Sequence, residues 1–174
     1  GALAGGDGNT ASGDNSVIAG GTSNTASANH STVGGGDANW ASGAASTISG
    51  GAGSQADGDE STVGGGIDNH ALGNRSTVAG GIGNTTSNEA ATVGGGRFNS
   101  ARGQYSVVSG GGSSFLSDSN AALGDYSTIG GGSSNVVSGE GGFVGGGRHN
   151  KARGYYTVVG GGGGFNTSDS NSAL

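Results

Sequence analysis

The sequence predicts an all-β protein, a β-solenoid (β-roll) of about 11–12 coils with 15 residues per coil. Three observations support this: a 15-residue repeat, an aliphatic residue at the same place in every unit, and a composition that excludes helix. Gly accounts for 45 of the 174 residues, and each Gly costs a helix about 1 kcal/mol relative to Ala. No apolar stripe with helical spacing accompanies them. Large apolar residues are so scarce that only the periodicity distinguishes this chain from a disordered one.

The 15-residue unit is seen clearly from Ser31 to Ala45, and we number its positions from Ser31 as position 1. Triplets such as Ser31-Thr-Val33, bounded by Gly runs, predict very short strands separated by turns. A single strand of this length cannot fold alone. Stacked at a spacing of ~4.8 Å, each strand pairs with its copies in the coils above and below, which predicts a solenoid ~55 Å long.

Position 3 is aliphatic in every unit, and we expect its side chains to point inward as a core ladder. Position 11, small or medium in size, is expected to face this ladder from the returning strand. The predicted core ladder is Leu3, Ile18, Val33, Ile48, Val63, Val78, Val93, Val108, Ile129, Val144 and Val159.

Positions 5 and 6 are both Gly in every unit, which predicts a sharp corner with positive φ or close backbone approach. Position 9 is mostly Asn, a residue that bonds turn backbone and tolerates a left-handed conformation. Stacked Asn side chains can also bond to one another along the axis. The predicted Asn ladder is Asn9, Asn24, Asn39, Asn69, Asn84, Asn99, Asn135 and Asn150.

The chain is a single repeat array over 1–174. An insertion of six residues interrupts the 15-residue pattern and divides the array into segments. Regular coils occupy 1–105, a coil with the insertion 106–126, regular coils 127–156, and the start of another coil with the insertion 157–174. The motif Ser117-Asp-Ser-Asn-Ala-Ala-Leu123 returns as Ser168-Asp-Ser-Asn-Ser-Ala-Leu174, which defines a 51-residue super-repeat. Because the chain starts and stops in mid-pattern, we interpret it as a fragment of a longer one.

The narrow core predicts association, since a slim coil buries little apolar area against the entropy cost of ordering its residues. Gly-Gly-Gly segments let backbones approach closely, so we expect a side-by-side homotrimer, able to extend into a filament. The formal net charge of −6 argues against nucleic acid and anionic membranes as partners. No apolar run approaches the roughly 18 residues of a transmembrane span, so no direct membrane insertion is expected.

The units resemble the head repeats of the trimeric autotransporter adhesins, the YadA-like β-roll. That family carries a Ser-x-aliphatic-x-Gly strand followed by a small-residue Ala-Ser-Gly turn. The matching segments here are Ser16-Val-Ile-Ala-Gly20, Thr25-Ala-Ser27, Trp40-Ala-Ser-Gly43 and Asn99-Ser-Ala-Arg-Gly103. The resemblance implies a left-handed β-roll, three intertwined or abutting chains, and adhesion from a bacterial surface. Similar Gly-rich units also occur in phage tail fibres and other bacterial surface proteins.

Candidate chemical sites are weak in this sequence, and we expect no enzyme, no cofactor and no regular metal site. Gly5-Gly-Asp-Gly-Asn9 is similar to a calcium-binding nonapeptide, but position 7 carries Thr22, Ala52, Ile67 and Arg97 in other units. Asp118 and Asp169 are better isolated calcium candidates, although a loop-capping role suits them more. The three His residues occupy different positions of the repeat and lack the spacing of a shared metal site.

Two surface features suggest binding. Thr recurs at position 2 and would form a row of hydroxyls of the kind that ice-binding solenoids present, interrupted by Val17, Val107, Phe143 and Val158. Aromatic and basic residues gather in the later half of the chain, where they suit contact between subunits or with a ligand. The predicted contact surface is Arg97, Phe98, Tyr105, Arg148, Tyr155 and Tyr156.

These observations predict a structural, non-catalytic segment of an extracellular surface fibre or adhesin, which provides mechanical extension and attachment. Its partners would be other copies of itself and a host or matrix surface ligand. One alternative is a phage or viral tail-fibre shaft of similar architecture. Another, from a different class, is a soluble ice- or ligand-binding β-solenoid.

Overall fold

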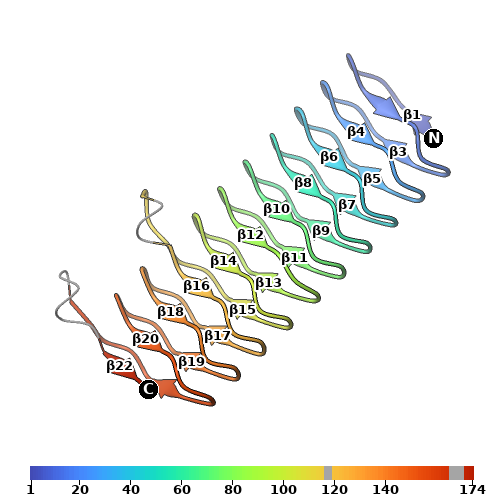
Figure 1. Ribbon diagram of the computed structural model, residues 1–174. Coiled ribbons are helices and arrows are strands. Elements are labelled where there is room, and N and C mark those ends of the chain that lie inside the picture. Colours follow the sequence, from blue (N-terminus) through green and yellow to red (C-terminus); the bar gives the residue numbers. More distant parts are fainter. Residues whose placement is uncertain (116–118, 165–170) are drawn as a thin grey trace.

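The chain folds as a parallel β-solenoid with about 15 residues per turn, as predicted (Figure 1). It has about ten turns, slightly fewer than the 11–12 expected. The computed structural model describes residues 1–115, 119–164 and 171–174. Over these residues there is no helix, and hence none long and apolar enough to cross a membrane. Two sheets of 11 strands each run along the solenoid.

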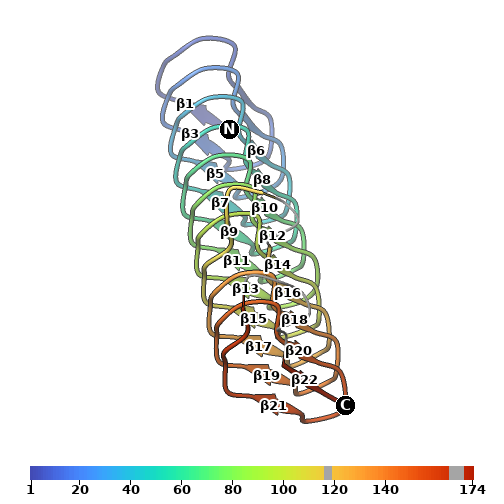
Figure 2. The same cartoon turned by 90° about the vertical axis from the view of Figure 1, so that its left-hand side faces the viewer.

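Every strand is two residues long, and successive strands alternate between the two sheets (Figure 2). The odd-numbered sheet contains β1 (Ala2–Leu3), β3 (Val17–Ile18), β5 (Thr32–Val33), β7 (Thr47–Ile48), β9 (Thr62–Val63), β11 (Thr77–Val78), β13 (Thr92–Val93), β15 (Val107–Val108), β17 (Thr128–Ile129), β19 (Phe143–Val144) and β21 (Val158–Val159). The even-numbered sheet contains β2 (Thr10–Ala11), β4 (Thr25–Ala26), β6 (Trp40–Ala41), β8 (Gln55–Ala56), β10 (His70–Ala71), β12 (Thr85–Thr86), β14 (Ser100–Ala101), β16 (Ala121–Ala122), β18 (Val136–Val137), β20 (Lys151–Ala152) and β22 (Ser172–Ala173).

The register follows the repeat without a slip. Thr62 pairs with Thr77, and Thr77 with Thr92, so equal positions of neighbouring coils stack directly. Across the insertion Val107 pairs with Thr128, which restores the register after the six extra residues. Position 7 adds isolated parallel bridges, from Asp7 to Arg97 and again between Ser133 and Arg148.

The core is a ladder of aliphatic side chains from position 3 facing a ladder of small side chains from position 11. The first residue of each strand points outward and the second inward, as the period of two in a β-strand requires. Ile18 through Val144 at position 3 are fully buried and Val159 is nearly so. Leu3 is 52% exposed, because the first coil has a neighbour on one side only.

In the thin core, a larger side chain at one position is accompanied by a smaller residue at a neighbouring position. Val137 occupies position 11, where most coils have Ala, and Gly142 occupies the following position 1, where most have Ser. A Cβ built on Gly142 would lie 2.6 Å from Cγ1 of Val137. A larger residue on one strand is therefore matched by the loss of a side chain beside it, as close packing demands.

Two narrow edges join the sheets. We call the turn from each odd-numbered strand to the next even-numbered one (34–39, for example) the glycine edge, and the opposite turn (42–45) the return edge. The described part of the first insertion extends from the glycine edge beside β16 (Figure 1). Gly112 still donates its N–H to the carbonyl of Gly132, as position 7 does elsewhere, so the extra residues lie between Gly112 and Asn120.

The Gly pair forms a corner with positive φ. Gly81 at position 6 has φ +99°, and a Cβ there would lie 2.2 Å from the carbonyl oxygen of Gly96 in the next coil. The expectation that Asn tolerates a left-handed corner does not hold for position 9. Positions 8 and 15 adopt positive φ instead, for example Ala38 (53°) and Ala45 (55°), because the Asn side chain at position 9 is turned into the interior.

Candidate functional site

The Asn ladder is an internal structural element that binds each coil to the next. Nδ2 of Asn84 donates to the carbonyl oxygens of Gly80 (2.9 Å) and Gly96 (3.0 Å). Its Oδ1 accepts the backbone N–H of Asn99 at 2.9 Å. The side chain therefore satisfies buried groups of its own coil and of the following one. The same donor bonds are made by Asn24, Asn39, Asn69, Asn99, Asn135 and Asn150, and by Asn9 at the exposed end.

The ladder also contains a member that the sequence reasoning missed. Asn120 donates to the carbonyl oxygens of Gly110 and Gly132, and its Oδ1 accepts the backbone N–H of Asn135. It was overlooked because the insertion separates it from Asn99 by 21 residues. Counting 15 residues back from Asn135 would have found it.

The return edge carries a second, exposed ladder at position 14, which the sequence reasoning also missed. Oδ1 of Asn74 accepts the backbone N–H of Asp59 (3.0 Å), and Oδ1 of Asp59 accepts that of Ala44 (2.9 Å). Asp125 does the same for Gln104 across the insertion. The recurrence of Asp, Asn and Glu at position 14 was the available signal.

The predicted contact surface is divided between the two edges. Arg97, Phe98 and Arg148 lie on the glycine edge, whereas Tyr105, Tyr155 and Tyr156 lie on the return edge. The guanidinium carbon of Arg97 lies 5.9 Å from the centre of the Phe98 ring, and Arg97 donates to the hydroxyl of Ser114 in the first insertion. The six residues therefore do not form one patch.

Exposed tyrosines follow the return edge. The rings of Tyr105 and Tyr126 stack with centroids 5.2 Å apart and planes inclined by 11°. Tyr156 lies over Gly141, whose Cβ would be 2.4 Å from the Tyr156 ring. Tyr155 and Tyr156 are 77% and 72% exposed. Such exposure of a large amphipathic side chain is typical of recognition surfaces.

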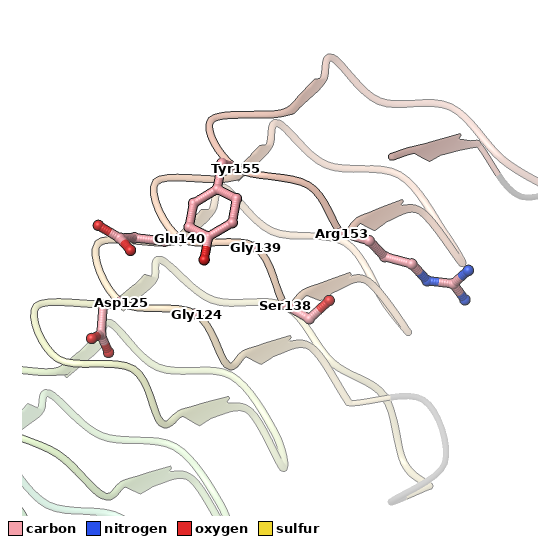
Figure 3. Close-up of a pocket in the computed structure, with 7 residues that line it drawn as sticks. All are labelled: Gly124, Asp125, Ser138, Gly139, Glu140, Arg153 and Tyr155. Carbon is pink, nitrogen blue, oxygen red and sulfur yellow. The ribbon is translucent and has the colours of Figure 1, made fainter.

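A shallow groove of about 370 Å³ lies on this edge (Figure 3). Gly124 and Gly139 at position 13 form its floor. Asp125 and Glu140 line one side, and Ser138 the other. The ring of Tyr155 stands at one end next to Glu140, while the guanidinium of Arg153 points away along the sheet. These residues come from three successive coils.

The described part of the chain does not bring potential metal ligands together. It contains no group of three or more His, Asp or Glu side chains placed to hold a metal ion. His30, His70 and His149 lie at positions 15, 10 and 8, on different lines along the solenoid. Asp7, Thr22 and Asp37 do stack at position 7, but Ala52 continues that column without a carboxylate. Asp118 and Asp169 lie outside the described residues.

The comparisons with known proteins give no family for the chain. No family model matches it, and no curated protein matches it either.

Proposed function

We propose that this chain is a structural, non-catalytic segment of an extracellular surface fibre or adhesin, in which three copies pack side by side, as in the YadA-like β-roll it resembles. Its role is mechanical extension and attachment. A phage or viral tail-fibre shaft would use the same architecture.

The continuity of the axial bonding carries this proposal. Backbone pairing in both sheets and the Asn ladder repeat from coil to coil through the insertion. Each coil contacts only its neighbours, so the array grows in one dimension. Ten spacings of ~4.8 Å make a rod about 50 Å long.

The outward face of the odd-numbered sheet supports side-by-side packing. Positions 2 and 4 on this face carry Thr, Val, Ala, Gly, Ser and one Phe, and no charged residue at all. All charges of a chain with net charge −6 therefore lie elsewhere. Copies that meet through this face avoid burying charge, which is the costly step in forming an interface.

The same face favours one alternative function. Thr32, Thr47, Thr62, Thr77 and Thr92 pair in exact register, one per coil, and form a straight row of partly exposed hydroxyls. A regular row of this kind suits a soluble solenoid that binds ice or another ordered ligand.

Electron cryo-microscopy of the native assembly tests the proposal. Three chains per cross-section in a filament with ~4.8 Å axial layers would support it. Discrete monomers would contradict it, and thermal hysteresis of the monomer, lost in a Thr62→Lys/Thr77→Lys variant, would establish ice binding instead.

A further inference from the structure

The groove on the return edge carries an inference about a ligand. We infer that the groove formed by Gly124, Asp125, Ser138, Glu140 and Tyr155 binds an oligosaccharide, with one sugar ring stacked on Tyr155 and its neighbour lying over the glycine floor. The inference rests on the proposed attachment function and names the class of ligand to which the protein would attach. Binding requires only the folded chain, so it can be tested separately from the assembly of a fibre.

The walls of the groove select a ligand rich in hydroxyl groups. The Asp125 and Glu140 carboxylates only accept hydrogen bonds, and the Ser138 hydroxyl both donates and accepts. Asp125 uses Oδ1 for the Gln104 N–H, which leaves its second oxygen for a ligand. Carboxylates along the side of an open groove suit the donor hydroxyls of a sugar, which carries no charge to desolvate.

The end of the groove selects a ligand with a flat apolar face. Tyr155 is 77% exposed and its ring stands beside Glu140 (Figure 3). A hexose with equatorial hydroxyls presents C–H groups on its ring faces and hydroxyls around its rim. Such a ring stacks on Tyr while its rim reaches the carboxylates, so both features of the groove are used together.

The corresponding residues 51 positions earlier show what keeps this groove open. Ser87, Glu89 and Arg102 match Ser138, Glu140 and Arg153 there. However, Glu89 forms an ion pair with Arg75, and Asn88 stands in place of Gly139 and bonds the Arg102 carbonyl.

The aromatic end is missing from that earlier region as well. Gln104 stands where the later groove has Tyr155. In the earlier region Asn88 and Glu89 therefore already bond to other groups of the protein. Among the residues that the structure describes, no ion pair involves Glu140.

The test is an NMR titration of the isotope-labelled 174-residue chain with cellotetraose and, separately, chitotetraose. We expect one of them to bind with a dissociation constant of about 1 mM, as a shallow groove allows. Shifted amide signals should come from residues 124–125, 138–140 and 155.

Variants identify the contacts. Tyr155→Gln copies the residue at Gln104, and Glu140→Gln keeps the shape of the side chain; each should weaken binding about tenfold. Trp40→Gln removes an exposed aromatic from the even-numbered sheet, copies Gln55, and should leave binding unchanged.

Three outcomes would overturn the inference. One is the absence of shifts with both oligosaccharides up to about 10 mM. Another is binding that Trp40→Gln weakens as much as Tyr155→Gln does. The last is that only a Lys-rich peptide binds, through Glu140 and independently of Tyr155, which would make the groove a peptide site.

Discussion

Oδ1 of Asn69 accepts two hydrogen bonds from Asn84 in the next coil, one from the backbone N–H (3.0 Å) and one from Nδ2 (3.2 Å). Both side chains are fully buried. The ladder thus joins side chain to backbone and side chain to side chain along the axis. Because each side chain bonds groups of its own coil and of the next one, the ladder members are expected to contribute more to stability than single surface bonds.

Asn84→Ala should lower the free energy of unfolding by about 3 kcal/mol, because the Gly80 carbonyl and the Asn99 N–H lose their partner inside the protein and the Gly96 carbonyl keeps only the Ile82 N–H. Asn84→Ser should cost less, since Ser54 already occupies the ladder and accepts the Asn69 N–H at 3.3 Å. Urea unfolding followed by circular dichroism measures both. Equal stability of Asn84→Ala and the wild type would show that the ladder is dispensable.

Ser54→Asn should stabilise the protein by about 1 kcal/mol. Ser54 is the one described coil position where Ser interrupts the Asn ladder, and Asn would reach the carbonyls of Gly50 and Gly66 as its equivalents do. The unfolding midpoint in urea should rise, and Ser54→Ala is the control that should lower it. A lower midpoint for Ser54→Asn would mean that this coil differs in shape from its neighbours.

Gly81→Ala should destabilise by about 3 kcal/mol or more, because φ is +99° and the new Cβ would meet the Gly96 carbonyl. The adjacent Gly80 is its matched control. The nearest atom to a Cβ there is 3.8 Å away, so Gly80→Ala should change stability by no more than about 0.5 kcal/mol. If both variants unfold alike, the corner is less constrained than this geometry requires.

Val137 and Gly142 should be energetically coupled. Gly142→Ser alone would collide with Val137, and Val137→Ala alone would leave a cavity, each costing about 2 kcal/mol. The double variant restores the Ala and Ser pair of most coils and should approach wild-type stability. A double-mutant cycle from urea unfolding gives the coupling energy; simple additivity would refute the compensation.

Excision of the first insertion should leave the solenoid intact. Replacing residues 113–119 by a single Ala, the residue at position 8 in Ala38, keeps the stacking of Asn99, Asn120 and Asn135. Stability should change by about 1 kcal/mol or less, because a shorter loop costs slightly less to close. Loss of the β-type circular dichroism spectrum would show that the insertion has a structural role.

The solenoid fold could be predicted because each coil repeats the same local sequence pattern. Period, strand triplets and Gly pairs all point to one coil shape, so no long-range pairing had to be guessed. The interior hydrogen bonds of Asn69 and Asn84 were harder to predict from the sequence, since an Asn in a turn and an Asn in a buried ladder look alike there. For this reason the prediction that the Asn at position 9 has a left-handed backbone conformation was wrong.

The candidate site could be predicted only in part. The basic and aromatic residues were recognised, but Phe98 and Tyr105 are seven residues apart in the chain and lie on opposite edges of the coil. Asp125, Glu140 and Tyr155 come together because each is 15 residues from the next and therefore one coil further along the axis.

The sequence by itself determined the period, the all-β class and the residues that face the core, because the inward and outward positions repeat in every unit. Only the tertiary structure decided which side chains share an edge, which carboxylates remain unpaired, and where the groove opens. Those properties depend on contacts between coils, and a contact exists only once neighbouring coils have stacked in register.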